Sequence, residues 1–335
     1  MKKLSLYAGV LALLLAGTFT SCSVEDNAVE DNGTYEVLDN GDDLEKAILL
    51  YGENGVLDLS GTNIEVLVIP AESEYIIDVP VTIIGNNKLT LIAKNSLFLS
   101  SSLTLENVKI DASELNAPVF IMDNDFPTED VNDKGAYEIE NFTLANVSID
   151  GLKNQVFYCN KQKYLIKDFN IKQCNFNYDG AKNKTIFDFN GGGLAQNITV
   201  EETSILAKNS SWSNGGFYST QSGSKMSDLT TDPDAKQIFT IKGNNFSHIS
   251  EGKTLCTLRE KDQTWQSYEI KNNTIENCGK QGQFIVGFNA GSYINKKDNW
   301  DVSGNIVLWD GNNIGAAENE KCGIENACIV LDTDN

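Results

Sequence analysis

The chain contains one histidine, His248, and one arginine, Arg259, which limits the acid–base chemistry available to it. A nucleophile–histidine triad would depend on His248. That residue stands beside an expected strand in NNFSHIS, and we interpret it as a turn or surface residue. Arg259 is a candidate catalytic residue, but Glu260 and Asp262 follow it and offer simple surface ion pairs. Arg259 is thus the one catalytic candidate that we name, while a catalytic pair of carboxylates assembled from several loops is an open alternative.

One acidic loop has the composition of a calcium site. Its carboxylates are Asp123, Asp125, Glu129, Asp130 and Asp133. Dense hard oxygen ligands suit calcium, although the spacing is not that of an EF-hand. A solvated acidic loop has the same composition, so calcium is an alternative and no cofactor is required. No Cys/His cluster has zinc spacing, and Gly191-Gly192-Gly193 lacks the Lys-Ser/Thr of a phosphate-binding loop.

Aromatic and amide side chains recur in long loops and favour a carbohydrate-binding surface. Aromatic rings stack on the apolar faces of sugars, and amides bond to sugar hydroxyls. The loops span 123–138, 160–168, 190–197, 220–237, 259–267 and 289–299. The candidate glycan-binding residues are Phe126, Tyr137, Tyr164, Asn190, Trp265, Asn289 and Tyr293. Alternatively, these aromatic rings seal the loops against the scaffold.

The scaffold that must position these loops is encoded by seven copies of one pattern. Each copy has an apolar-x-apolar triplet, a bend of small or polar residues, and an apolar residue seven positions after the first. The copies start at Leu103, Phe142, Phe169, Ile198, Phe239, Tyr268 and Trp300. The alternation indicates strands, and a unit of this size must stack on its neighbours to bury its apolar face. The intervals leave no room for the helices of a βαβ fold.

A second family of strands keeps pace with the first. Its members are expected to begin at Phe120, Phe157, Phe187, Phe217, Cys256 and Val286, each followed by a polar residue or Arg259. Asn244, Asn273 and Asn305 occupy equivalent bends, where we predict a stack of amides bonded along the axis. In the earlier coils the equivalent bend position is occupied by Val108, Val147, Cys174 and Thr203. Together these columns predict an all-β fold, a right-handed parallel β-helix with one copy per coil.

The N-terminal part of the domain fits the same fold. Residues 42–51 (DDLEKAILLY) predict a short amphipathic helix that caps the open apolar end of the coil, and Asn54-Gly55 predicts a turn into a strand. The segment 66–93 (VLVIPAESEYIIDVPVTIIGNNKLTLIA) resembles the start of pectate-lyase-like β-helix proteins. That resemblance implies three enzyme classes: lyases with an Arg or Lys base and a cation, polygalacturonase-type hydrolases, and pectin methylesterases. The His-Gly, Arg-x-Lys and Gly-Arg-Pro-Trp motifs of the last two classes are missing.

Residues 1–21 have the features of a secretory signal: Lys2 and Lys3, an apolar run and then small residues. The stretch FTSC, ending at Cys22, resembles a bacterial lipobox, which implies lipidation of Cys22; an ordinary signal peptide with a chance cysteine is the alternative. We expect residues 22–40 to form a flexible tether and residues 41–335 to form the β-helix domain. Acidic residues after Cys22 resemble the signal that exports lipoproteins to the outer face of the outer membrane.

The net charge limits the classes of molecule that the chain can bind, and the positions of the cysteines indicate which thiols are buried. The net charge is −21 and becomes −23 once the two lysines of the signal are removed, which argues against nucleic acid as a partner. Cys159, Cys174, Cys256 and Cys278 lie at or beside apolar strand positions and should be buried thiols, whereas Cys322 and Cys328 either form a disulfide or stay free.

Over about residues 1–22 and 66–335 the chain resembles β-helix lipoproteins of Gram-negative polysaccharide-utilisation systems. This resemblance implies a lipid-anchored protein of the outer membrane that holds polysaccharide at the cell surface, with outer-membrane glycan-import proteins as partners. We expect glycan binding without cleavage. The alternatives are a polysaccharide lyase or glycoside hydrolase, and a structural or adhesive surface protein.

Overall fold

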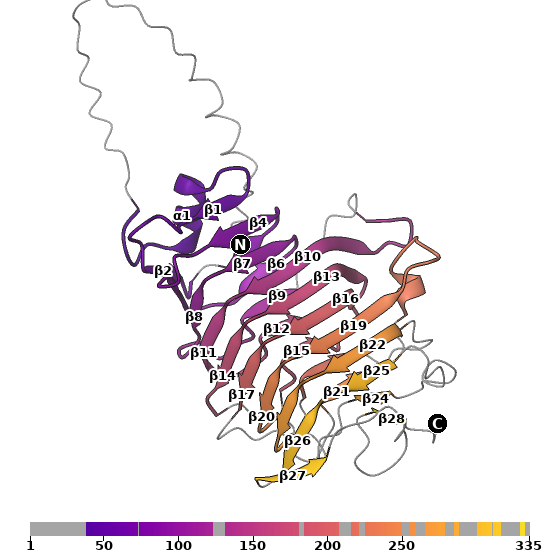
Figure 1. Ribbon diagram of the computed structural model, residues 1–335. Coiled ribbons are helices and arrows are strands. Elements are labelled where there is room, and N and C mark those ends of the chain that lie inside the picture. The colour runs from indigo at the N-terminus through magenta and orange to yellow at the C-terminus, as the bar shows by residue number, and fades with distance from the viewer. Residues whose placement is uncertain are drawn as a thin grey trace, which may run out of the picture.

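The computed structural model describes residues 38–72, 74–122, 131–180, 184–207, 216–220, 225–249, 255–258, 265–278, 285–287, 300–309, 311–315 and 329–331. Over these residues the chain winds into a parallel β-helix with one helix at its N-terminal end (Figure 1). Each complete coil contributes one strand to each of three sheets, A, B and C. The predicted all-β fold, a parallel β-helix with an N-terminal capping helix, is therefore confirmed.

The chain runs from sheet B through a short bend to sheet A, then to sheet C, and returns to sheet B in the next coil. Sheet B consists of β1 (Val56–Asp58), β4 (Val81–Ile84), β7 (Leu103–Glu106), β10 (Tyr137–Ala145), β13 (Tyr164–Lys172), β16 (Leu194–Glu201), β19 (Gln237–Lys242), β22 (Trp265–Lys271) and β25 (Trp300–Ser303). All its neighbouring strands are parallel.

Sheet A follows the bend. It consists of β2 (Val66–Ile69), β5 (Thr90–Ala93), β8 (Lys109–Asp111), β11 (Ser148–Leu152), β14 (Asn175–Tyr178), β17 (Ser204–Leu206), β20 (Asn245–Ser247), β23 (Thr274–Glu276), β26 (Ile306–Trp309) and the antiparallel β27 (Asn312–Gly315). Sheet C consists of β3 (Tyr75–Ile77), β6 (Leu97–Leu99), β9 (Phe120–Met122), β12 (Phe157–Cys159), β15 (Phe187–Phe189), β18 (Tyr218–Thr220), β21 (Cys256–Leu258), β24 (Ile285–Gly287) and β28 (Ile329–Leu331).

The seven predicted copies stack in register. Phe142 pairs with Leu103 on one side and with Phe169 on the other, and the same column continues to Trp300. Every side chain of this column whose burial is described lies in the core, which fills the coil as one continuous apolar cluster. Aromatic rings dominate its middle: Phe142 stacks on Phe169 with ring centroids 5.1 Å apart, and Phe157 and Phe187 meet Phe169 edge-on.

The second strand family differs from its prediction by one residue in two coils. Phe187 pairs with Tyr218, and Cys256 pairs with Ile285, so these strands begin one residue away from the expected Phe217 and Val286. Two adjacent apolar residues do not show which of them begins the inward–outward alternation of the strand, and this explains the difference. Phe217 and Tyr218 are both fully buried.

The predicted asparagine stack is present at the bend between sheets B and A. Asn244 donates from its backbone N–H and from Nδ2 to Asn273 Oδ1, at 2.9 and 3.0 Å, and Asn273 repeats both bonds to Asn305 at 3.0 and 2.9 Å. Each Nδ2 also donates to a backbone carbonyl one coil back. All three side chains are at most 2% exposed, so the amides satisfy backbone groups that water cannot reach. In earlier coils Cys174 takes this position, where burial raises the pKa of its thiol to about 12 and keeps it unreactive.

The N-terminal helix α1 (Leu44–Tyr51) closes the first coil. Asp43 caps it by accepting a hydrogen bond from Lys46 N, and Leu44, Ala47 and Ile48 are buried against the core. The sequence predicts a flexible tether that extends to residue 40. Leu38, however, is buried, and Asn40 Oδ1 accepts hydrogen bonds from the backbone N–H groups of Glu65 and Val66 at the start of β2. Residues 38–40 therefore belong to the fold.

A second, small apolar cluster lies outside the main core. β10, β13 and β16 extend beyond their neighbours, and Leu165 and Leu194 on these extensions pack with Ala136, Met226 and Leu229. Met226 opens the 3₁₀ turn η3 (Met226–Asp228) of the long insertion before β19. Part of this insertion thus folds back onto sheet B.

Candidate functional site

The predicted binding loops leave the C-terminal ends of the sheet C strands and lead to sheet B, as expected. Several predicted residues lie outside the described part of the chain: Cys22, Asp123, Asp125, Phe126, Glu129, Asp130, Arg259, Asn289, Tyr293, Cys322 and Cys328. Trp265 is the first residue of β22 and pairs with Gln237. Asp133 is exposed on a turn, and no group of three His, Cys, Asp or Glu residues able to hold a metal occurs within the described residues. Calcium binding stays a prediction.

The structure corrects the role expected of Tyr164. Its side chain is fully buried, and its ring meets that of Tyr137 edge-on with centroids 5.7 Å apart. A ring without exposed surface cannot stack on a sugar, so Tyr164 seals the loop against the coil instead. Tyr137 is half-buried and packs against the core.

The three consecutive glycines allow the chain to pass close to the previous coil. A Cβ at Gly191 would lie 2.3 Å from the carbonyl oxygen of Cys159, and one at Gly193 would lie 2.6 Å from Cys159 Sγ. Gly192 has φ of 110°, which other residues rarely adopt. The glycines therefore place the exposed Asn190 at the edge of sheet C without serving as a phosphate loop.

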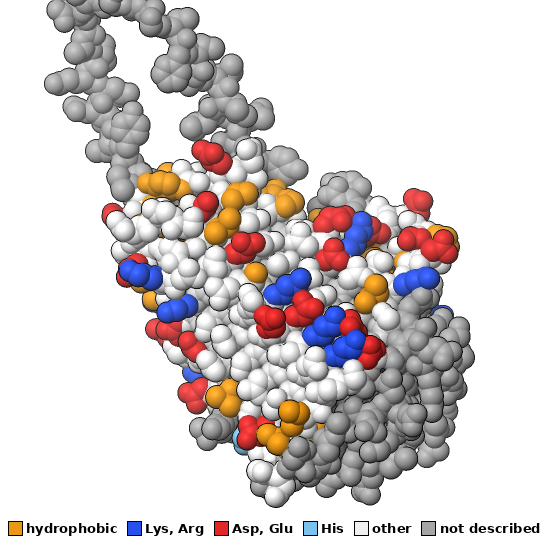
Figure 2. Space-filling model, in the orientation of Figure 1, with side chains coloured by type: hydrophobic (Ala, Val, Ile, Leu, Met, Phe, Trp, Pro, Cys, Tyr) orange, Lys and Arg blue, Asp and Glu red, His pale blue; other side chains and the backbone are white. Residues whose placement is uncertain are grey.

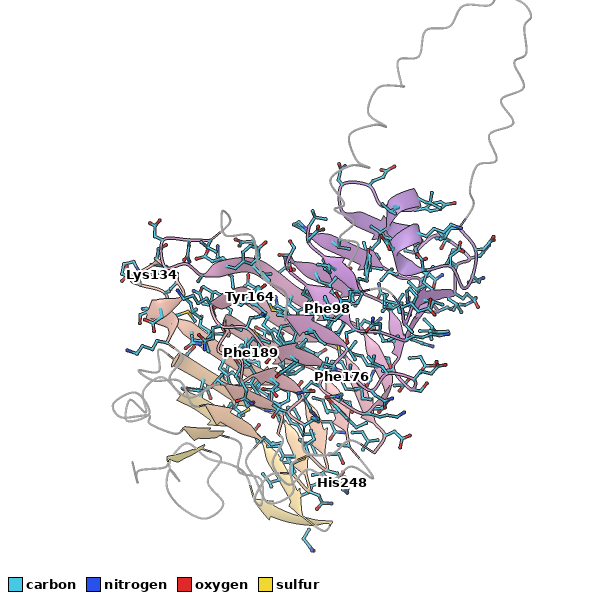
Figure 3. The ribbon with its side chains drawn as sticks, turned by 180° about the vertical axis from the view of Figure 1, so that it is seen from behind. Phe98, Lys134, Tyr164, Phe176, Phe189 and His248 are labelled. Atoms are coloured by element: carbon cyan, nitrogen blue, oxygen red, sulfur yellow. The ribbon has the colours of Figure 1, made fainter. Side chains whose placement is uncertain are left out.

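The outer face of sheet C carries a row of apolar side chains that sequence reasoning missed. The strands β3, β6, β9 and β12 of this sheet bury their first and last residues and point their middle residue outward. Ile76, Phe98, Ile121 and Tyr158 occupy this position in four consecutive coils, pair in register and are partly exposed. Phe98 is marked in Figure 3. Strand spacing makes the row about 14 Å long. Tyr158 Oη donates to Asn160 Oδ1 at 2.8 Å, which sets a polar pair beside the last ring.

A polar cluster continues this row in the next two coils. Asp188 and Ser219 take the outward position in β15 and β18 but are only 7% and 6% exposed. The Asp188 carboxylate accepts hydrogen bonds from Ser219 Oγ at 3.3 Å, Asn190 N at 3.0 Å and Gln155 Nε2 at 3.3 Å. Gln155 Oε1 is buried and has no partner among the described residues, although buried acceptors usually have one. The cluster is thus a buried hydrogen-bond network rich in acceptors, with the exposed Asn190 at its edge.

The outer face of sheet B is charged, and its described side chains form no such apolar row. Figure 2 shows acidic and basic side chains gathered over its strands. Glu269 lies between two lysines, with its carboxylate 2.7 Å from Lys242 Nζ and 3.1 Å from Lys271 Nζ, and Lys271 also pairs with Asp301. The hydrogen bonds from Lys242 and Lys271 lower the pKa of Glu269, and that from Lys271 lowers the pKa of Asp301. Glu269 thus offsets the repulsion between two neighbouring lysines.

The ion pairs of Glu269 predict that its contribution to the stability of the fold decreases at acidic pH. A carboxyl whose pKa is lower in the folded state stabilises the fold above its unfolded pKa, near 4.3 for Glu, and loses that effect as the pH falls through the folded value. Replacing Glu269 by Gln should therefore cost about 0.5–1 kcal/mol at pH 7, and this cost should become smaller as the pH is lowered from about 4.3 towards about 3. Thermal melts across this range measure the difference. Glu114→Gln, on an exposed carboxylate, is the control, and an equal effect of both variants at every pH would contradict the prediction.

The single histidine belongs to a structural network. His248 has φ of 61° at the turn after β20, so the predicted turn position is confirmed. Its Nδ1 lies 2.8 Å from Ser247 Oγ, which donates to Glu276 Oε2 at 3.0 Å. In a nucleophile–histidine triad the acid orients the imidazole, whereas here Glu276 binds the serine. The arrangement is not that of a triad.

No helix among the described residues is long and apolar enough to span a bilayer. Comparisons of the chain with family models, with curated proteins and with solved structures give no match.

Proposed function

We propose that the protein is a lipid-anchored cell-surface protein that binds polysaccharide without cleaving it, along the outer face of sheet C. The row of Ile76, Phe98, Ile121 and Tyr158 carries this proposal. Apolar and aromatic surface in a line on a rigid scaffold suits the apolar faces of successive sugar rings.

The polar groups at the end of the row supply what sugar hydroxyls need. Asn190 and Asn160 are exposed at the edge of the sheet, where their amides can reach sugar hydroxyls. Hydroxyls are both donors and acceptors, so they match carboxylate and amide groups. Asp188 is the one carboxylate in the outward column of the described strands, whereas hydrolysis of glycosides usually employs two. This favours binding over hydrolysis.

The location of the cap supports the proposed anchoring. Leu49, Leu50 and Val56 are exposed on or beside α1, at the end where Leu38 N donates to Tyr51 Oη. Figure 2 shows hydrophobic side chains at this end. A lipid on Cys22 would attach this end of the coil to the outer membrane and leave sheet C free for glycan, which import proteins in the same membrane would receive.

The test is affinity electrophoresis of the chain from residue 23 onward against a panel of neutral and acidic polysaccharides. We expect retardation by at least one glycan, and a roughly tenfold loss of affinity in Phe98→Ala and Tyr158→Ala, corresponding to about 1.4 kcal/mol each. The control is Ile306→Ala, which removes an exposed apolar side chain from sheet A. A single cooperative thermal transition above the assay temperature shows that each variant folds.

Reducing ends and new ultraviolet-absorbing products are measured in the same samples. New ends would replace the proposal by the hydrolase or lyase alternative. Retardation by no glycan would favour the structural or adhesive alternative. Binding that both ring variants leave unchanged would remove sheet C as the site.

A further inference from the structure

A polar pocket lies on the bend between sheets B and A, apart from the outer face of sheet C. Its volume is about 280 Å³, and its polar lining consists of Asn87, Asn107, Lys109, Asn146, Ser148 and Asn175. Two columns of residues form its walls. The asparagines of the bend have φ of 65°, 57° and 52°, so their side chains project from left-handed turns. Lys109, Ser148 and Asn175 are the first residues of β8, β11 and β14 and pair in register.

Hydrogen bonds inside the pocket leave it rich in donors. Asn146 Nδ2 donates to Asn87 Oδ1 at 3.1 Å and to Asn107 Oδ1 at 2.8 Å. Because these bonds occupy the amide oxygens, the Nδ2 groups of Asn87 and Asn107 remain as donors. No acceptor for either Nδ2 group occurs among the described residues.

The side chain of Lys109 gives the pocket a positive charge. The ammonium of Lys109 is exposed and forms no ion pair within the described part of the chain, whereas the neighbouring Lys88 pairs with Glu65 at 3.2 Å. No carboxylate lines the pocket. Amide N–H groups around a single ammonium are the donors that bind anionic oxygens, and charge-assisted bonds of this kind are the stronger ones. The surplus of donors persists in a chain whose net charge is −21.

We propose that this pocket is a second binding site, which takes an oxyanion group: sulfate, phosphate or carboxylate. Asn87 and Asn107 donate from Nδ2, Lys109 supplies the charge, and Ser148 and Asn175 add donors from the next two coils. The inference does not depend on glycan binding at sheet C. The anion is either a free ion or a substituent of an acidic glycan.

The test is calorimetric titration of the chain from residue 23 onward with sodium sulfate, phosphate and acetate, at constant ionic strength against chloride. We expect saturable binding of at least one anion. Asn107→Asp should weaken it at least tenfold, because the variant keeps a side chain that tolerates the left-handed turn but replaces the donor by a negative charge. Lys109→Met should weaken it similarly. Lys94→Ala, which removes an exposed lysine elsewhere, should change nothing.

Dextran sulfate and unmodified dextran separate the two sources of the anion. Binding of dextran sulfate, but not dextran, that Asn107→Asp abolishes identifies a substituent of a polymer as an acceptable ligand. Binding confined to the small ions identifies a free anion. The proposal is overturned if none of the anions binds saturably, or if Asn107→Asp and Lys109→Met bind as tightly as Lys94→Ala. The outcome is independent of Phe98 and Tyr158, so it is distinguishable from the test of sheet C.

Discussion

Replacing Phe169 by alanine is expected to lower the free energy of unfolding by about 4 kcal/mol. The side chain is fully buried in the middle of the coil, and its ring meets those of Phe142, Phe157, Phe187 and Phe189. The substitution removes these contacts and leaves a cavity that strands paired on both sides cannot collapse to fill.

Urea unfolding followed by circular dichroism measures the loss. Phe98→Ala is the matched control, because it deletes the same ring from the outer face of sheet C. We expect its cost to stay below about 1.5 kcal/mol, since partly exposed apolar surface contributes in proportion to the area buried. Equal losses in the two variants would contradict the assignment of Phe169 to the core.

Replacing Asn273 by leucine, which has a similar size, should cost about 3–5 kcal/mol, because several buried polar groups would lose their partners at about 1–3 kcal/mol each. The backbone N–H and Nδ2 of Asn244 would lose their acceptor, and the carbonyl of Ile241 would lose a donor. Water cannot replace these bonds, since Asn273 is 1% exposed.

Hydrogen exchange provides a second readout for this variant. The amide of Asn244 should exchange slowly in the wild type and much faster in Asn273→Leu. Asn245→Ala removes an exposed amide from the adjacent residue and should leave both stability and exchange unchanged. A loss below 1 kcal/mol, with Asn244 still protected, would mean that the stack does not stabilise the coil.

The sequence predicted the features that alternate or repeat. Sheets B and A were found because apolar and polar residues alternate about a bend, and the asparagine stack was found because Asn244, Asn273 and Asn305 recur at one position of that bend. Hydrophobic period and bend chemistry are local properties, so a single chain reveals them.

The apolar row of sheet C could not be found in the same way. Strands such as LFL at residues 97–99 and FYC at residues 157–159 are apolar at every position, so no alternation shows which side chain points outward. Only pairing between coils assigns the middle residue to the surface. Tyr164 was misplaced for a related reason: it stands in a loop-rich segment, yet the run Tyr164-Leu165-Ile166 that follows the loop is wholly buried.

The available donors of the polar pocket between sheets B and A depend on contacts that the spacing of residues in the sequence does not reveal. Asn87 lies in the bend between β4 and β5, which is three residues longer than the bend between β7 and β8, and it contacts Asn146 two coils away. The contact of Asn146 with Asn87 determines which amide atoms remain available to a ligand. The separation of these residues along the sequence does not predict this contact.

The in-register pairing of Phe142 with Phe169 also makes the protein adjustable in length. Removal of residues 142–168 would bring β13 against β7, so that Phe169 would pair with Leu103 in place of Phe142. The other inward-facing residues of β13 would likewise pair with the β7 residues that now pair with β10. The molecule would shorten by one strand spacing, about 4.8 Å, without a change of architecture. Duplication of the same segment would lengthen it by the same step. The length of the coil is therefore a quantity that deletion or duplication of whole repeats changes in discrete increments.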